Sequence, residues 1–423
     1  MSAPIVSKIR FTRALSSRPF ALLWAGQTIS ALGDGAYFTA LAWEVLLLTG
    51  SAGAMGLVLI ASSTPRLIFL LIGGVTADRV SRRAVMLCSD AGRALAVLAI
   101  AILGWANVLQ LWHLVALALL FGLVSAFFMP AYQSIPPQLL EGELLNSANA
   151  LTGLSRQIGL LLGPGIGAAL VAASNPASAF AFDGLTFVVS ALCLLLLRLP
   201  EHARSAPKPP DSAGKRRGLG GVLADAREGV AYITGSTWLW VIIAVASVQN
   251  VGSSGFAVSL PKLVKVTFHQ GVWLLGAIGI ATAAGTIAGT LIVGQAPRLH
   301  RRGLLACLGL LSSFIAYTLF GVPFARAIEP PIVVAAAVIF GFGLGAFDII
   351  WVTTLQELVP ADKLGRVFSV DMLGSFALMP LGYAIIGALT DRVGPGMVFL
   401  AGGAINIALT LVALAVPGVR RLE

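Results

Sequence analysis

Long runs of apolar residues, separated by short polar segments, dominate the chain. Twelve runs have at least about 20 residues, the length at which a helix crosses a bilayer. Runs such as Leu192 to Leu197 do not alternate apolar and polar residues as a membrane barrel strand does. Lipid offers backbone groups no hydrogen-bond partner, so helices are expected. The predicted spans are 20–48, 53–76, 84–105, 111–132, 145–173, 177–198, 237–262, 271–295, 303–325, 330–352, 363–389 and 396–417.

The composition supports a polytopic, all-α membrane protein. Of the 423 residues, 57% are hydrophobic and 11% are charged, whereas soluble domains carry about 25% charged residues. The three cysteines, Cys88, Cys193 and Cys307, lie inside predicted spans and form neither a disulfide framework nor a metal-binding spacing. No cofactor is expected. The first apolar run is too long for a cleavable signal peptide, and more spans follow it.

Basic residues gather in the loops on one side of the predicted spans. Of the 28 Lys and Arg residues, 21 fall on that side and only Lys262, Lys265, Arg326 and Arg392 on the other. Positive loops face the cytoplasm, which predicts cytoplasmic termini and a multi-pass protein of the cell inner membrane. The net charge of +10 is explained by these loops, so no nucleic-acid partner is expected.

The second half of the chain repeats the first at a constant spacing. Arg79, Arg82 and Arg83 lie 219 positions before Arg298, Arg301 and Arg302, since 298 − 79 = 219. The same spacing relates Gly33 to Gly252, Cys88 to Cys307, Phe121-Gly122 to Phe340-Gly341, and Gly163 to Gly382. The pattern predicts an N-terminal six-helix bundle (1–198), a cytoplasmic linker (199–235) and a C-terminal six-helix bundle (236–423). Two parallel repeats are typical of secondary transporters.

Several motifs resemble those of the major facilitator superfamily. Residues 74–83 are similar to its signature loop Gly-x-x-x-Asp-Arg-x-Gly-Arg-Arg, with Ser81 in place of the second Gly. Within the superfamily, the resemblance is to the proton-coupled drug, macrolide and siderophore exporters. It is carried by residues 23–27 with 32–34, 130–135, 163–167 and 364–369. One departure is that the fourth span holds His113 but no Arg, so a cation for proton relay must come from elsewhere.

The resemblance implies a gating role for the basic hairpin. It places Asp78 against the start of span eleven, near Lys363 to Arg366, where the carboxylate locks one conformation. A carboxylate is stabilised at a helix N-terminus by about 0.3–1 kcal/mol. The alternative is that the arginines of the hairpin only set topology. The predicted gating residues are Gly74, Asp78, Arg79, Arg82, Arg83, Gly163, Pro164, Gly167, Gly365 and Arg366.

Charges inside the spans are candidates for proton coupling, because an ionisable group at bilayer depth costs about 2.5 kcal/mol or more. Asp34 lies about 21 Å along the first span at 1.5 Å per residue, and Arg66 lies at similar depth and is its expected partner. Asp90 and Arg93 are one turn apart and can pair. The alternative for each is a structural ion pair. The proton-coupling candidates are Asp34, Arg66, Asp90, Arg93, Arg156 and Asp348.

Other polar residues receive weaker assignments. Asp183 and Glu44 lie near span ends and are expected at the surface, and Asp371 is expected at an interface. In span five, Gly163, Pro164 and Gly167 predict a kinked, tightly packed helix, with Pro380 and Gly382 as counterparts in span eleven. An apolar cavity with a few polar groups suits a small amphipathic substrate. The substrate-binding candidates are Trp24, Gln27, Tyr37, Gln249, Asn250, Phe256 and Trp351.

These observations together predict a monomeric secondary transporter. No phosphate-binding loop, zinc-protease motif or nucleophile elbow occurs, so an enzyme is not expected. We expect proton-coupled efflux of drugs, antibiotics or siderophore-like metabolites by alternating access. The alternatives are a proton-coupled importer or facilitator, and a non-transporting membrane protein on the same fold.

Overall fold

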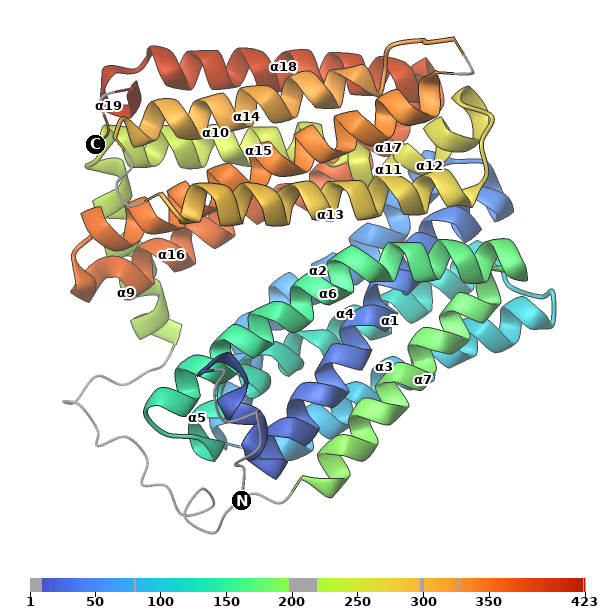
Figure 1. Cartoon of the computed structure of the whole chain (residues 1–423), viewed down its shortest axis with the longest axis horizontal. Coiled ribbons are helices and arrows are strands. Elements are labelled where there is room, and N and C mark those ends of the chain that lie inside the picture. Colours follow the sequence, from blue (N-terminus) through green and yellow to red (C-terminus); the bar gives the residue numbers. More distant parts are fainter. Residues whose placement is uncertain are drawn as a thin grey trace, which may run out of the picture. The chain divides into compact units, whose positions relative to one another are not determined.

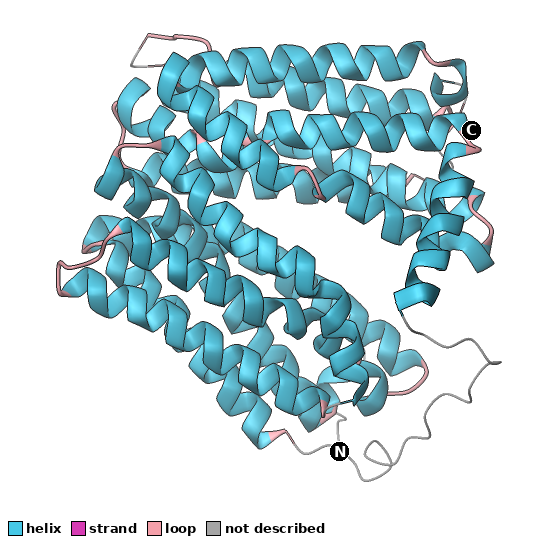
Figure 2. Ribbon diagram, turned by 180° about the vertical axis from the view of Figure 1, so that it is seen from behind, coloured by secondary structure: helices cyan, strands magenta, loops and turns pink. Residues whose placement is uncertain are grey.

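The computed structural model describes residues 10–79, 81–197, 219–296, 300–325, 328–420 and 422, and these contain helices and loops but no strand (Figure 2). Twelve helical segments in this part of the chain are long and apolar enough to cross a membrane. Large apolar side chains such as Leu192, Leu195 and Leu196 are exposed, which suits contact with lipid. The predicted all-helical, twelve-span membrane fold is confirmed.

The chain divides into two compact units. Unit 1 comprises Met1–Gly50, Leu57–Pro207 and Gly271–Gly276, and unit 2 comprises Ser51–Gly56, Lys208–Gln270 and Ala277–Glu423. The helices of the first repeat are α1 (Arg18–Thr49), α2 (Ala52–Arg79), α3 (Arg82–Trp105), α4 (Leu111–Gln133), the short α5 (Pro136–Leu139), α6 (Glu143–Ala173) and α7 (Pro176–Leu196) (Figure 1). Within unit 1, α1 packs against α6 and α7, and α3 packs against α4 and α7.

The second repeat follows the same order. Its helices are α9 (Leu219–Thr234), α10 (Thr237–Ser253), α11 (Gly255–Val258), α12 (Leu260–Lys262), α13 (Val272–Gly294), α14 (Arg302–Leu319), α15 (Glu329–Leu358), α16 (Ala361–Phe376), α17 (Met379–Val393), α18 (Pro395–Ala415) and α19 (Pro417–Arg420). In unit 2, α14 packs against α15 and α18. The predicted eleventh span is divided into α16 and α17 just before Pro380, whose ring and missing N–H do not fit a continuous helix.

Aromatic contacts recur at the spacing of 219 residues. In unit 1, the rings of Tyr37 and Phe121 stack with centroids 5.4 Å apart. In unit 2, the rings of Phe256 and Phe340, 219 positions later in each case, stack with centroids 5.1 Å apart. The repeat seen in the sequence is therefore also a repeat of packing contacts.

Glycines allow α1 and α6 to approach closely. A Cβ added at Gly163 would lie 2.6 Å from the Cα of Gly35, and one added at Gly167 would lie 2.6 Å from the carbonyl oxygen of Ala36. Pro164 lies inside α6 between these contacts. The equivalent Gly382 in unit 2 packs against Val251 and Ser254. The tight packing predicted for span five is confirmed, and small residues are what permit it.

Two helices begin in one unit and continue in the other. The first residues of α2, through Gly56, belong to unit 2, and the first residues of α13, through Gly276, belong to unit 1. A Cβ at Gly56 would lie 2.4 Å from the carbonyl oxygen of Tyr383, and a Cβ at Gly276 would lie 3.0 Å from that of Pro164. Tyr383 and Pro164 are 219 positions apart and Gly56 and Gly276 are 220 positions apart, so the two close approaches lie at nearly corresponding places in the two repeats.

We expect Gly163→Ala to destabilise the protein, because the new methyl group would meet the backbone of α1 rather than a movable side chain. The overpacking should cost about 1–3 kcal/mol, measured as a lower midpoint of thermal unfolding in detergent. Gly153→Ala on the same helix is the matched control, because nothing lies within 4 Å of a Cβ added there. Equal midpoints for the two variants would contradict the packing described.

Candidate functional site

A buried ion pair forms the centre of the polar site in unit 1. Asp90 and Arg93 lie one turn apart on α3, and an Nη atom of Arg93 donates a hydrogen bond to Oδ1 of Asp90. Their exposed fractions are 0% and 6%. The pairing predicted from their spacing is confirmed. A buried charge is strongly unfavourable unless it is paired, so each of these groups depends on the other.

Aromatic rings enclose the guanidinium group of Arg93. Its central carbon lies 4.1 Å from the centroid of the Phe128 ring on α4 and 4.4 Å from that of the Phe187 ring on α7. A cation over an aromatic face is attracted by the ring quadrupole, and more strongly where water is excluded. The two rings therefore hold a cation in the apolar interior between α3, α4 and α7.

Two neutral side chains extend the pair toward α1. The hydroxyl group of Ser190 on α7 donates to Oδ2 of Asp90 at 2.7 Å, and Nε2 of Gln27 on α1 donates to Oγ of Ser190 at 2.8 Å. Gln27, a substrate-binding candidate, thus contacts the charged network instead of standing apart from it. The network joins three helices of unit 1.

Asp183 also lies in this site, and its predicted surface position is wrong. Its side chain is on α7 and has no exposed area. Thr186 Oγ1 donates to the main-chain carbonyl oxygen of Asp183 at 2.7 Å and makes a longer contact of 3.3 Å with Asp183 Oδ1. A Cβ added at Gly33 would lie 2.4 Å from Oδ1. Because Gly33 has no side chain, the carboxyl group can lie against α1 beside residue 34.

A polar stripe in the sequence would have revealed Asp183. On the otherwise apolar α7, Asp183, Thr186 and Ser190 occupy positions i, i+3 and i+7, which share one face of a helix. The prediction used only the distance of Asp183 from the end of the span. The described residues contain no group of three His, Cys, Asp or Glu placed to hold a metal ion.

Asp34 is half-buried on α1 and interacts electrostatically with this cluster. Among its charged neighbours, Arg93 acts most strongly, followed by Asp90 and then Arg66. Arg66, the partner expected from depth alone, is exposed on α2. The electrostatic interaction of Asp34 with Arg93 is thus stronger than that with Arg66.

The other charged candidates are exposed. Arg156 is exposed on α6, and Asp348 is exposed on α15 of unit 2, where it interacts with Asp371. Asp371 accepts a hydrogen bond from Nε1 of Trp351 at 3.0 Å, inside the same unit. His113 accepts the backbone N–H of Gln110 at Nδ1 (3.0 Å) and so caps the start of α4.

The equivalent helix interface of unit 2 is polar but uncharged. Nε2 of Gln249 on α10 donates to Thr410 Oγ1 at 2.7 Å and to the carbonyl oxygen of Asn406 at 3.1 Å, both on α18. A Cβ added at Gly252 would lie 2.9 Å from Oδ1 of Asn406, as one at Gly33 would meet Asp183. In both repeats a glycine lets a polar side chain of the neighbouring helix approach closely. That side chain is a carboxyl group in unit 1 and an amide in unit 2.

The polar groups of the substrate-binding candidates make contacts within their own units. Nε1 of Trp24 donates to the carbonyl oxygen of Leu151 at 3.0 Å, and Nδ2 of Asn250 donates to that of Ser375 at 2.8 Å. Gln249 is only 4% exposed. Tyr37 and Phe256 belong to the aromatic stacks, and Trp351 binds Asp371. The structure accounts for each of these side chains by packing between helices.

The gating candidates are only partly described. Arg83 donates from Nε and Nη2 to the carbonyl oxygens of Leu194 and Leu195, each at 2.7 Å. A cation is favourable at a helix C-terminus, so Arg83 stabilises the end of α7. Arg82 is half-buried at the start of α3. The side chains of Gly74, Asp78 and Arg79 lie outside the described residues.

The candidates at the start of span eleven lie on α16. Arg366 makes an ion pair of 2.8 Å with Glu228 on α9, between side chains that are 30% and 49% exposed. Nothing lies within 4 Å of a Cβ added at Gly365, so close packing does not require a glycine there. Unlike the cluster in unit 1, this pair is solvated.

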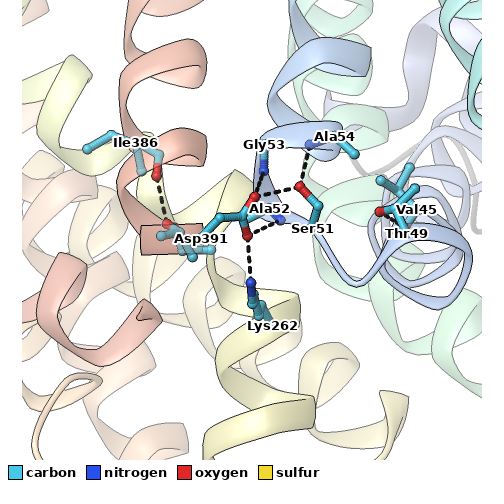
Figure 3. A network of polar contacts seen from close by, with 11 residues as sticks. Val45, Thr49, Ser51, Ala52, Gly53, Ala54, Lys262, Ile386 and Asp391 are labelled. Carbon is cyan, nitrogen blue, oxygen red and sulfur yellow. Dashed lines mark hydrogen bonds and ion pairs between the residues drawn. The ribbon is translucent and has the colours of Figure 1, made fainter. Parts of the chain in front are cut away.

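A second dense polar network surrounds Asp391 on α17 (Figure 3). Its carboxylate accepts the backbone N–H groups of Ala52 and Gly53, each at 2.9 Å, and the hydroxyl group of Ser51 at 2.5 Å. Lys262 Nζ lies 2.5 Å from Asp391 Oδ1. The N-terminus of α2 is thus capped by an acidic side chain distant in the sequence, where the helix dipole favours negative charge.

Comparison with known proteins gives a consistent result across the chain. The family model described as Major Facilitator Superfamily matches residues 23–383. The multidrug efflux pump Tap of Mycolicibacterium fortuitum is 27% identical, covering 95% of this chain and 96% of its own length. Macrolide efflux protein A of Streptococcus pyogenes is 22% identical, covering 96% and 97%. A solved bacterial homologue of the human lysosomal transporter Spinster has a TM-score of 0.65 at 15% identity, covering 98% of both chains.

We expect Asp90→Asn to destabilise unit 1 because it removes the carboxylate that is ion-paired with the buried Arg93 cation. The loss of unfolding free energy should be about 3–5 kcal/mol, measured by thermal or denaturant unfolding in detergent. The double variant Asp90→Asn with Arg93→Met removes both charges and should recover much of the loss.

Glu228→Ala is the control for this prediction, because it breaks the exposed pair with Arg366. Its cost should stay below about 1 kcal/mol. The account of the buried pair is refuted if Glu228→Ala costs as much as Asp90→Asn, or if the double variant is no more stable than Asp90→Asn.

Proposed function

The chain belongs to the Major Facilitator Superfamily, and from this we propose that it is a proton-coupled exporter of small amphipathic drugs or antibiotics. Members of this family are transporters and not enzymes. We also propose that the protein is a monomer in the cell inner membrane and that both of its termini lie in the cytoplasm.

The observation that carries the proposal is the buried, titratable cluster of unit 1. Asp34, Asp90 and Asp183 interact with one buried guanidinium group, that of Arg93. Carboxyl groups can take up and release protons, and their protonation responds to burial and to nearby cations. The amide network at the corresponding interface of unit 2 has no such property. Energy coupling is therefore assigned to the first repeat.

The names of the relatives support export of amphipathic compounds. One is a multidrug efflux pump and one a macrolide efflux protein, and each aligns over nearly its full length. Siderophore-like metabolites, expected from the sequence, are a second substrate class for the same transport assay. A proton-coupled importer or facilitator is the competing outcome of the experiment below.

In the proposed cycle, the two repeats expose the substrate site alternately to the two sides of the membrane. Asp34 takes a proton from the outside, and the substrate leaves. Gly74, Asp78, Arg79, Arg82 and Arg83 act at the cytoplasmic loop, together with Gly365 and Arg366. Gly163, Pro164 and Gly167 permit movement of α6 against α1. Arg66, Arg156 and Asp348 adjust the charge balance. The aromatic and amide candidates contact the substrate in a conformation other than the one described, in which Tyr37, Gln249 and Trp351 are buried.

We expect Asp34→Asn to abolish efflux driven by a pH gradient, because the amide cannot bind and release a proton. The measurement is movement of ethidium and of a macrolide in proteoliposomes with an imposed pH gradient. Glu44→Gln is the matched control, since Glu44 is a second half-buried carboxyl group on α1 and lies outside the proposed machinery. Proton-driven efflux that persists in Asp34→Asn would remove Asp34 from the proton site.

The direction of transport is tested in inverted membrane vesicles energised by proton pumping. An exporter accumulates the probe inside such vesicles, whereas an importer does not. A facilitator equilibrates the probe without any dependence on the gradient. Either of the last two results would replace the proposed function.

A further inference from the structure

We propose that Asp183 is a proton-carrying residue and that Arg93 changes its ion-pair partner from Asp90 to Asp183 when that proton is lost. The inference rests on the proposed proton coupling and adds to it a residue and a switch. It depends on two complementary atoms in the buried cluster of unit 1.

The first atom is the second oxygen of Asp183. Asp183 has no exposed area, and Thr186 donates to its Oδ1. Its Oδ2 has no hydrogen-bond partner among the described residues. An ionised carboxylate that is buried and half unsatisfied is strongly unfavourable, whereas a neutral carboxylic acid loses most of that cost. The arrangement therefore suits Asp183 with a proton bound.

The second atom is a donor of Arg93. One Nη atom binds Asp90, but Nε is buried and has no acceptor among the described residues. Asp183 interacts electrostatically with both Arg93 and Asp34. An unused N–H donor and an unused carboxyl oxygen thus lie in one cluster. Both are satisfied if Arg93 turns toward Asp183.

The charge count points in the same direction. Fully ionised, Asp34, Asp90 and Asp183 carry three negative charges, against one on Arg93 and one on the exposed Arg66. The cluster is then left with a net charge of −1, which is unfavourable in a low-dielectric interior. A single bound proton restores neutrality. Asp90 is ion-paired with Arg93, and Asp183 has a buried carboxyl oxygen without a hydrogen-bond partner among the described residues, so we assign the proton to Asp183.

The switch has two states. In one, the O–H bond of Asp183 is intact and Arg93 pairs with Asp90, as in this structure. In the other, the O–H bond breaks, its electron pair stays on Asp183, the proton leaves to water, and Arg93 pairs with the new carboxylate. Asp90 keeps its hydrogen bond from Ser190, which lessens the cost of losing Arg93.

The test is infrared difference spectroscopy of the purified full-length protein in liposomes, between acidic and alkaline pH. We expect the wild type to show the carbonyl band of a buried carboxylic acid that disappears at high pH. Asp183→Asn should lose this band, and Glu44→Gln should keep it. An unchanged band in Asp183→Asn, or no such band in the wild type, overturns the proposal.

A second variant covers the case in which Asp183→Asn does not fold. Thr186→Val keeps the carboxyl group but removes its hydroxyl donor, so the band should remain and shift in frequency; an unshifted band contradicts the assignment. The spectroscopic result does not depend on transport. If Asp183 titrates but a pH gradient drives no efflux, the proposed function is wrong and the proton site at Asp183 remains. If a pH gradient drives efflux but Asp183 does not titrate, only the inference about Asp183 is wrong.

Discussion

The cost of burying charge among apolar helices is the constraint on which unit 1 depends. Arg93 lies inside the unit, between the rings of Phe128 and Phe187, with Asp90 as its ion-pair partner. Such a cation is stable only while its charge is balanced. Ser190, Gln27 and the bare backbone at Gly33 are arranged around that requirement. The apolar composition needed to enter a membrane therefore makes the few internal charges strongly dependent on one another.

The two repeats keep the same packing but not the same chemistry. The aromatic stacks at Tyr37–Phe121 and Phe256–Phe340 are equivalent, and Gly33 and Gly252 make corresponding close approaches. The groups that these glycines face differ: a carboxyl in unit 1 and the amide of Asn406 in unit 2. Packing fixes which small and aromatic residues are needed, whereas the polar partner is free to vary. A duplicated scaffold can thus place an ionisable group at this helix interface in one copy and an amide in the other.

The sequence predicted the architecture well, because membrane spans and internal repeats depend on hydropathy and spacing alone. The pairing of Asp90 with Arg93 also followed from spacing, since both are on one helix. Contacts between helices did not follow. Asp183 was misplaced because distance from a span end says nothing about which helix face is buried. The interaction of Asp34 with Arg93 was missed for the same reason, because it joins two helices. The cap that Asp391 provides to α2 joins residues 340 positions apart, and no local pattern encodes it.

Helices α2 and α13 each have their first turn in one compact unit and their remaining residues in the other. The first turn of α2 packs closely against a neighbouring helix at Gly56, and the first turn of α13 does so at Gly276. The carboxylate of Asp391 also accepts a hydrogen bond from the first turn of α2. If the first turn of α2 left Asp391, the backbone N–H groups of Ala52 and Gly53 would lose their acceptor. Leaving a backbone donor without an acceptor costs free energy, so the carboxylate of Asp391 holds the start of α2 in place.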